Sequence, residues 1–313
     1  MKPITAGVIL TRKCNLHCKY CAIPDRRANE LSTEKWFEAI DIIASLGIKK
    51  INFIGGETTL YKGIREVIAH TLSSKIEYCS LITNGIKGLP VIKDLINIGL
   101  MNISFSLDTV DINRSISPIK AQAGMELLYA IEKENLNNKI NMTAYCVINK
   151  TNIANIPELV KFLSEKKINT YFLPFHWDKA NIFEHRKDDY GLSLSNNHEL
   201  RELIERLVEM KKAGFLISNS SEFLRIIPNH IDKLDWRCTH LSELRVDADG
   251  KLMCCCDRQG TVHDKFTIFD LSDSIKMDKF LVEREKDALS CSGCLWPSSF
   301  EAELLNKERK YAN

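Results

Sequence analysis

The stretch Cys14-Asn15-Leu16-His17-Cys18-Lys19-Tyr20-Cys21 places three cysteines in a C-x3-C-x2-C spacing, just after a short apolar run at residues 4–10. Thiolates are soft ligands that suit iron–sulfur clusters. Three thiolates cover three irons of a cubane 4Fe–4S cluster and leave the fourth iron open to chelate a small molecule. A closed structural zinc site needs four ligands, and no fourth cysteine or suitably placed histidine completes one in this stretch. The spacing therefore predicts an open iron–sulfur site.

This spacing, with the aromatic Tyr20 just before the third cysteine, resembles the signature of the radical S-adenosylmethionine (SAM) enzymes. The resemblance implies that Cys14, Cys18 and Cys21 bind a 4Fe–4S cluster and that Tyr20 lies at the SAM site. It also implies that one electron from the cluster cleaves SAM to methionine and a 5′-deoxyadenosyl radical, which abstracts a hydrogen atom from substrate. A ferredoxin or flavodoxin type donor is then expected to supply the electron.

Composition limits the class of protein. The chain has 313 residues, 44% hydrophobic and 27% charged, which is typical of a globular protein with one large domain and a smaller one. A net charge of +2 and the lack of a basic run with interleaved aromatics disfavour nucleic acid. No apolar segment reaches ~18 residues, so we expect no membrane segment. Seven of the eleven cysteines fall in metal-ligand patterns, which favours a reducing, cytoplasmic location.

Strand-like and helix-like patterns alternate after the cysteines. We expect strands at residues 51–54, 102–108, 141–149 and 170–173 and one ending at 81–85, with helices near 36–43, 64–72, 91–98, 125–131 and 200–214 and another starting at 155–157. This alternation predicts an α/β fold with a parallel sheet. Periodicity does not distinguish a barrel from an open doubly wound sheet, whereas the resemblance implies a partial (β/α)6 barrel. We expect this barrel at residues 1–232 and a small iron–sulfur domain at 233–313.

Polar residues follow the predicted strands, where α/β folds bind their ligands. Gly55-Gly56-Glu57 comes directly after a strand, and its glycines allow a close backbone approach. The resemblance implies that this tripeptide contacts the SAM amino group, although Thr58 stands where the family often has proline.

The strand at 102–108 alternates between apolar residues and the polar Ser104, Ser106 and Asp108. We expect the polar set to face the barrel interior, although a solvated edge strand would show the same pattern. The resemblance implies SAM contacts for Ser106 and Asp108. It also implies contacts for two strand-end residues and one backbone position, which are Asn84, Asn149 and Leu173. Ordinary strand-terminal turns would explain the two asparagines equally well.

A second cysteine set lies towards the carboxyl terminus, at Cys238, Cys255, Cys291 and Cys294. Four thiolates can fully ligate a second 4Fe–4S cluster, and the spacing also permits zinc. With Gly250 five residues before Cys255, the pattern resembles the Twitch extension, a shortened SPASM domain found behind radical SAM barrels. Asp249-Gly250 predicts a hairpin turn between residues 244–246 and 251–253.

The remaining cysteines have weaker assignments. Cys256 follows the predicted ligand Cys255 directly, a placement that resembles the hydrogen-donor cysteine of some Twitch-bearing epimerases. A small buried residue in this position is the alternative. Cys79 and Cys146 are expected in the core.

The substrate is poorly defined by the sequence. His176, Trp177 and Asp178 follow the sixth strand and are candidate substrate contacts, with a polar surface loop as the alternative. Thirteen residues before Cys14 leave no room for a leader-binding domain, so we expect a short peptide or a small natural product. The leading hypothesis is epimerisation with Cys256 as hydrogen donor. The alternatives are dehydrogenation or cross-linking through the auxiliary cluster, tRNA modification, and a non-catalytic metal-binding adaptor.

Overall fold

The computed structural model describes residues 3–18, 21, 29–86, 88–175, 197–233, 236, 238, 242–255, 259–291 and 293–311. Within these residues the strands form one eight-stranded sheet in the order β6-β5-β4-β3-β2-β1-β7-β8. Six strands are parallel to their neighbours. The first is β1 (Thr5–Thr11), which coincides with the apolar run before the cysteines, and the other five were expected as strands, namely β2 (Lys50–Gly55), β3 (Tyr78–Thr83), β4 (Asn102–Ser106), β5 (Asn141–Ile148) and β6 (Asn169–Pro174).

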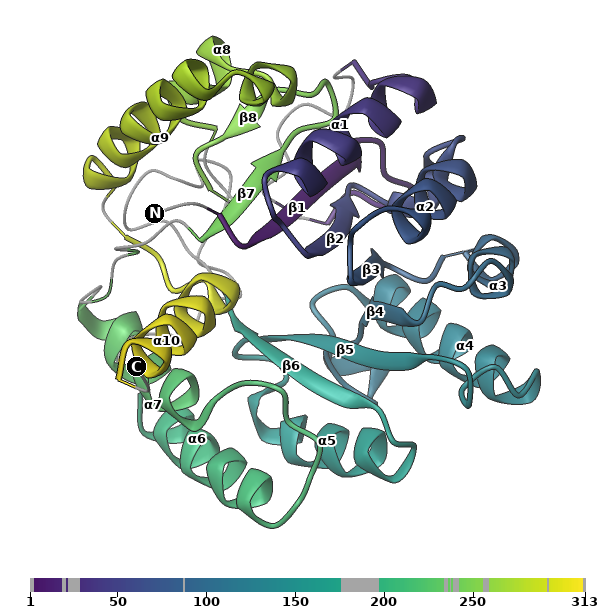
Figure 1. Cartoon of the computed structure of the whole chain (residues 1–313). Helices are drawn as coiled ribbons and strands as arrows, with labels where there is room; N and C mark the ends of the chain where they lie inside the picture. Colours follow the sequence, from purple (N-terminus) through teal and green to yellow (C-terminus); the bar gives the residue numbers. More distant parts are fainter. Residues whose placement is uncertain are drawn as a thin grey trace.

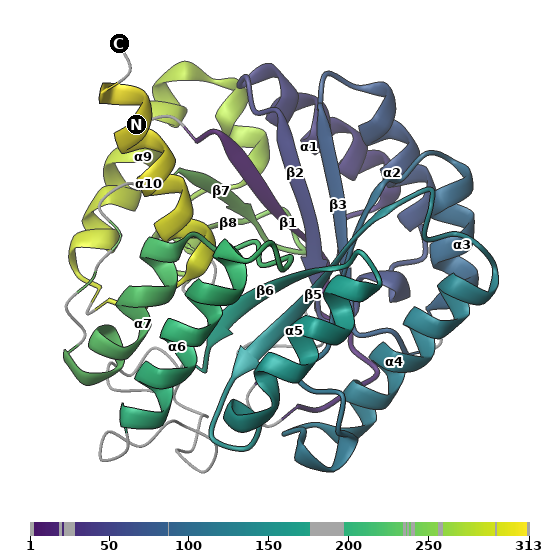
Figure 2. The same cartoon turned by 90° about the horizontal axis from the view of Figure 1, so that it is seen from below.

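Helices connect these strands and cover the outer face of the curved sheet (Figures 1 and 2). They are α1 (Thr33–Ser45), α2 (Ile64–Ser73), α3 (Leu89–Asn97), α4 (Pro118–Lys133), α5 (Ile156–Glu165), α6 (Asn197–Lys212) and α7 (Ser221–Lys233), with short 3-10 turns η1 (Thr58–Leu60), η2 (Ile112–Arg114) and η3 (Ile153–Asn155). The chain thus folds as the α/β partial barrel that the sequence predicted. No helix among the described residues is long and apolar enough to cross a bilayer.

Several local signals in the sequence set the helix ends. The Ser32 side chain accepts a hydrogen bond from Lys35 N at 3.3 Å and so caps α1. Pro157 lies in the first turn of α5, where proline costs no intrahelical hydrogen bond. Helix α4 begins at Pro118, several residues before the expected 125–131. Its first two turns are rich in alanine and lack a clear apolar stripe, so the sequence pattern did not reveal them.

The burial of alternate residues shows which face of each strand points inward. On β5 and β6, the residues that face the helices are buried, as Cys146 and Phe172 are, whereas Tyr145 and Tyr171 on the other face are half-buried. On β4, Phe105 and the following Leu107 lie against Gly124 of α4. The polar set of this strand therefore faces the barrel interior, which confirms the expectation from its alternation. Cys79 and Cys146 are both buried in the core, as expected.

The carboxyl-terminal segment continues the same sheet. Strand β7 (Glu243–Val246) pairs in parallel with β1, and β8 (Leu252–Met253) pairs antiparallel with β7. Gly250 has a φ of +83° and its N–H donates to Asp247 O at 2.9 Å, which confirms the predicted hairpin turn. Helices α8 (Val262–Lys265), α9 (Ser274–Leu289) and α10 (Pro297–Tyr311) and the turn η6 (Ile268–Ser272) follow. The division into domains at residues 232 and 233 stays a prediction.

Candidate active site

The three amino-terminal cysteines lie in the loop that follows β1, at the carboxyl end of the parallel strands. Cys14, Cys18 and Cys21 are thiols outside any disulfide and are partly exposed. Within the loop, Leu16 N donates to Cys14 Sγ at 3.4 Å, and Cys21 N donates to Cys18 O at 3.1 Å. Three accessible thiols in one short loop form the donor set that an iron–sulfur cluster with one open iron requires. The described residues of this site therefore fit such a cluster.

The Gly55-Gly56-Glu57 segment runs alongside the start of this loop. Gly56 N donates to Thr11 O and Glu57 N donates to Lys13 O, each at 2.8 Å. A Cβ added to Gly55 would collide with Thr11 O, and one added to Gly56 would collide with Lys13 O. The glycines are therefore required first by the backbone of the cysteine loop. A contact of this segment with SAM stays a prediction.

Glu57 joins the ends of β2 and β3 through its buried carboxylate. Its Oε1 accepts hydrogen bonds from the hydroxyls of Thr59 at 2.6 Å and Thr83 at 2.7 Å, and its Oε2 accepts from Asn84 N at 2.7 Å. Thr59 N adds a longer bond of 3.2 Å to Oε1. Only 1% of the residue is exposed, so these bonds are sheltered from water. Most of the acceptor capacity of Glu57 is thus used to fix the strand ends below the cysteine loop.

Asn84 lies beside the first cysteine, and its contact with SAM stays a prediction. Its Nδ2 donates to Asn15 Oδ1 at 2.8 Å and lies 3.7 Å from Cys14 Sγ. Asn15 Nδ2 in turn donates to Ile86 O at 3.3 Å. Because Glu57 holds the backbone of Asn84, the end of β3 supports the cysteine loop from one side.

The other predicted SAM contacts lie on or just after different strands and are buried to different degrees. Ser106 is half-buried on the inner face of β4, and Leu173 is half-buried on the inner face of β6. Asp108 is buried, and its Oδ1 accepts from Val147 N at 3.1 Å. Burial raises the pKa of Asp108, an effect that Lys120 and this hydrogen bond oppose. Asp108 therefore links the ends of β4 and β5.

Asn149 forms a local turn at the end of β5. Its Oδ1 accepts from Thr151 N at 2.9 Å, and its Nδ2 donates to Val147 O at 2.9 Å. The residue is fully buried. This is the ordinary strand-terminal turn that the sequence left open as an alternative. Its contact with SAM stays a prediction.

Three of the four carboxyl-terminal cysteines lie near enough to one another to interact electrostatically. Burial raises the pKa of Cys238 to about 12, and the thiols of Cys255 and Cys291 contribute to the rise. Gly293 N donates to Cys291 Sγ at 3.4 Å and starts the short turn that leads to Cys294. The donor set therefore fits a second thiolate-bound group.

The spacing of the sulfurs bears on which group this site would hold. A tetrahedral zinc with Zn–S bonds of about 2.3 Å would need sulfurs about 3.8 Å apart. Among the described residues, the single group of three potential ligand atoms within 4.8 Å of one another is Asp247, Asp249 and His263, and it contains no cysteine. In the described residues, the cysteine sulfurs are therefore not already gathered as a closed tetrahedral site.

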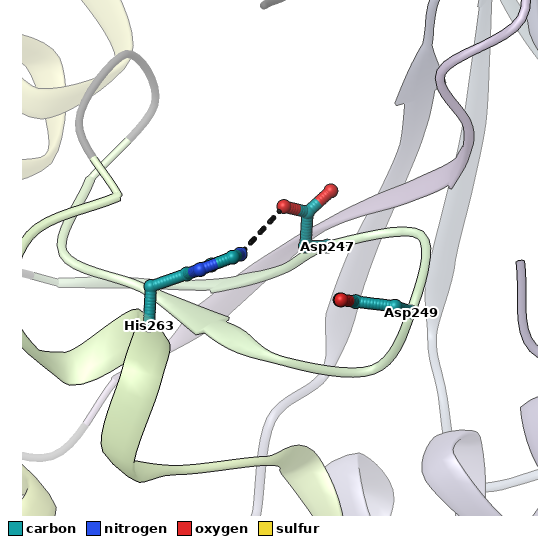
Figure 3. Close-up of side chains that lie close together, drawn as sticks. All are labelled: Asp247, Asp249 and His263. Carbon is teal, nitrogen blue, oxygen red and sulfur yellow. Dashed lines mark hydrogen bonds and ion pairs between the residues drawn. The ribbon is translucent and has the colours of Figure 1, made fainter. Parts of the chain in front are cut away.

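Figure 3 shows this acidic group on the β7–β8 turn, with His263 reaching it from α8. His263 Nε2 lies 2.9 Å from Asp247 Oδ2. Arg12 forms a two-pronged ion pair with the same carboxylate, with Nε 2.8 Å from Oδ1. Burial raises the pKa of Asp247, but the hydrogen bonds from His263 and Arg12 outweigh burial and lower it to about 2. Because a guanidinium already occupies this carboxylate, the group is an ion-pair network rather than a metal site.

Sequence reasoning missed this network, because Arg12 and Asp247 stand 235 residues apart in the chain. The sequence signal for this network was the basic residue Arg12, two positions before Cys14. Five predicted site residues lie outside the described residues, namely Tyr20, Cys256, His176, Trp177 and Asp178.

Comparison with known proteins identifies the family. The model of the radical SAM superfamily matches residues 8–163. A GTP 3′,8-cyclase of Thermodesulfovibrio yellowstonii is 30% identical over 263 residues, which are 78% of each chain. The chain belongs to the radical SAM superfamily. A GTP 3′,8-cyclase of Helicobacter pylori (strain ATCC 700392 / 26695) is 28% identical over 84% of this chain and 83% of its own.

A solved radical SAM structure shares the fold. Streptococcus suis SuiB bound to S-adenosylmethionine superimposes with a TM-score of 0.65 at 17% identity, over 89% of this chain. The alignment covers 65% of SuiB, just under two thirds of its length. The family implies a 4Fe–4S cluster and SAM, and Cys14, Cys18 and Cys21 are the residues that would hold the cluster.

The interior of this radical SAM barrel carries charges that are already paired. Arg245 on β7 forms an ion pair of 2.7 Å with Glu243, and its guanidinium occupies the space beside Gly7 on β1. Lys50 Nζ lies 4.2 Å from the centroid of the Tyr78 ring, and burial lowers the pKa of Lys50, against the effect of Glu243. The inner wall of β5 and β6 is aromatic, with the half-buried Tyr145 and Tyr171 rings 5.1 Å apart.

Proposed function

We propose that this radical SAM enzyme closes a ring or a cross-link within a peptide or a small natural product, with a second 4Fe–4S cluster held by Cys238, Cys255, Cys291 and Cys294. The observation that carries the proposal is the proximity of Cys238 to Cys255 and Cys291, whose thiols interact with it electrostatically. Four thiolates can fully ligate a cubane cluster.

When bound, the first cluster and SAM supply a carbon radical that abstracts a hydrogen atom from substrate. The net reaction would remove two hydrogens from the substrate: one would go to the SAM-derived radical, and the other would leave as a proton to solvent and an electron, for which the second cluster would be the acceptor. A new bond between two substrate atoms replaces the two bonds to hydrogen. The residues around Glu57 hold the cysteine loop and Asn84 in place for this chemistry.

The names of relatives support ring closure. The similar curated proteins are named GTP 3′,8-cyclases. SuiB was also solved bound to its precursor peptide SuiA, with a TM-score of 0.65 to this chain. These names favour bond formation over epimerisation. Epimerisation through Cys256 therefore becomes the second candidate, and it is favoured only by the position of Cys256 directly after Cys255.

The charges of the interior bear on the class of substrate. A triphosphate is bound most strongly by several cations that are free to pair with it. Among the described residues, Arg245 is paired with Glu243, and Arg12 is paired with Asp247. These two guanidiniums are therefore already engaged, which is the reason to test a peptide or a small uncharged molecule beside GTP, while the net charge of +2 disfavours tRNA.

The first test measures product mass in deuterated water, with anaerobically reconstituted protein, reductant, SAM and candidate substrates. A loss of two mass units without deuterium supports ring closure or another two-electron oxidation, and fragmentation of the product then locates the new bond. A gain of one deuterium that disappears in Cys256→Ala would establish epimerisation instead. Conversion of GTP would overturn the proposed substrate class. If the reduced protein does not cleave SAM, the hypothesis of a non-catalytic metal-binding adaptor would be supported instead.

A second test counts iron. The wild-type chain should bind about eight irons when reconstituted, and Cys255→Ala should bind about four, because each cubane holds four. Cys79→Ala is the matched control, since this cysteine is buried in the core away from both sites. Four irons in the wild type, or stoichiometric zinc in Cys14→Ala, would refute the second cluster.

A further inference from the structure

The β7–β8 hairpin contacts both ends of the segment that carries the first three cysteines. At the start of this segment, Arg12 is ion-paired with Asp247 of the hairpin. At its end, Leu31 N donates to Ala248 O at 2.8 Å, and the Leu31 side chain lies against Gly250. The carboxyl-terminal part of the chain thus holds the amino-terminal cysteine loop from two sides.

Asp247 is the centre of this contact. The side chains of Arg12 and Asp247 are 5% and 2% exposed. Asp247 Oδ1 also accepts from Ala248 N at 2.7 Å, so the carboxylate is fixed to its own turn. Removing one member of a buried ion pair leaves the other charge uncompensated and is strongly unfavourable. The position of Arg12, two residues before Cys14, therefore depends on the position of Asp247.

The same hairpin leads to the second cysteine set. Strand β8 ends at Met253, and Cys254 and Cys255 follow it directly. Arg284 of α9 donates from Nε to Cys254 O at 2.9 Å, and α9 ends two residues before Cys291. Arg284 is buried, so this bond is protected from water. The hairpin is therefore fixed on one side to the Cys14 loop and on the other to Cys255 and the segment that carries Cys291.

We propose that Asp247 is a positioning residue that couples the two cysteine-bearing segments, so that occupancy of the carboxyl-terminal site strengthens SAM binding at the amino-terminal site. This inference rests on the second cluster proposed above. When the carboxyl-terminal thiols bind their group, they fix the end of β8. The hairpin then holds Arg12, and with it the start of the Cys14 loop, in one position.

A double-mutant cycle tests this coupling. SAM affinity and the electron paramagnetic resonance spectrum of the reduced protein, with and without SAM, are measured for the wild type, C255A, D247N and the double variant. Couplings between sites are typically 5–150-fold in affinity. We expect C255A to weaken SAM binding at least about fivefold in the wild-type background and to have no further effect in the D247N background. The change that SAM produces in the spectrum should follow the same pattern.

Two further variants make the cycle specific. Asp249→Asn changes the neighbouring carboxylate, which accepts a local hydrogen bond from Lys251 N at 3.1 Å and pairs with Lys251 Nζ at 3.6 Å, and should leave the coupling intact. Arg12→Lys keeps the positive charge beside Asp247 but loses the two-pronged geometry, so it should weaken the coupling without leaving a buried charge unpaired. Arg12→Lys also tests the coupling if D247N fails to fold.

The outcomes separate the inference from the proposed function. If the wild type holds about eight irons and C255A weakens SAM binding equally in the wild-type, D247N and R12K backgrounds, the coupling is refuted and the second cluster stands. If C255A has no effect on SAM binding, the coupling is likewise refuted. If the wild type holds only about four irons, both fail. Loss of coupling in D247N with retention in D249N is the expected result.

Discussion

Replacing Glu57 by glutamine should destabilise the protein by about 3 kcal/mol. The glutamine carbonyl can take the place of Oε1 and accept from Thr59 and Thr83, whose hydroxyls can also rotate. Its NH2 group then faces Asn84 N, a backbone donor that cannot turn away from a position 2.7 Å from Oε2. One buried donor without an acceptor costs about 1–3 kcal/mol, and the loss of charge weakens the other bonds.

Urea unfolding of the metal-free protein measures this change. Glu77→Gln is the matched control, because Glu77 makes an exposed ion pair of 2.9 Å with Lys49 and should change the free energy of unfolding by less than about 0.5 kcal/mol. SAM affinity should fall in Glu57→Gln but not in Glu77→Gln, since the end of β3 supports the Cys14 loop. If the two variants had equal stabilities and equal SAM affinities, the assigned role of Glu57 would be wrong.

Three further predictions follow from the same contacts. Gly56→Ala should lose iron from the amino-terminal site, because its Cβ would collide with Lys13 O. Gly47→Ala strains a φ of +81° but meets no neighbouring atoms, so it should keep its iron even if it lowers stability. Cys294→Ala should retain SAM cleavage to 5′-deoxyadenosine while its iron content falls by about half; loss of SAM cleavage together with all iron would contradict this. The lowered pKa of Asp247, about 2 when folded against 3.8 as its ordinary value, should contribute about 2–3 kcal/mol to stability. Because the folded pKa is the lower one, this contribution is present above about pH 4 and is lost as the pH falls towards 2. The difference in the free energy of unfolding between wild type and D247N, measured by urea unfolding, should therefore shrink over this range. A difference that stays constant with pH would refute this contribution.

Local sequence determined the elements of the barrel and the main cysteine set. The alternation in β4 placed Phe105 against α4, and Asp249-Gly250 formed the predicted turn. Ser32 caps α1 through Lys35 N, a partner within one helical turn, so this helix start is encoded locally. Helices α7 and α9 were not predicted. Helix α9 buries charged residues, including Arg284, whose partners come from β7 and the end of β8, so its pattern does not show a simple apolar stripe.

The sequence by itself determined which residues can bind iron, since thiolate chemistry and short spacings are local properties, and the residues that contact SAM stay predictions. The tertiary structure alone decided what holds these residues in place. Gly55 and Gly56 are needed because the chain passes close to Thr11 and Lys13, and Asn149 caps its own turn. The pairing of Arg12 with Asp247 joins residues 235 positions apart. Such a contact arises only when β7 adds to the edge of β1, and no local pattern in either segment encodes it.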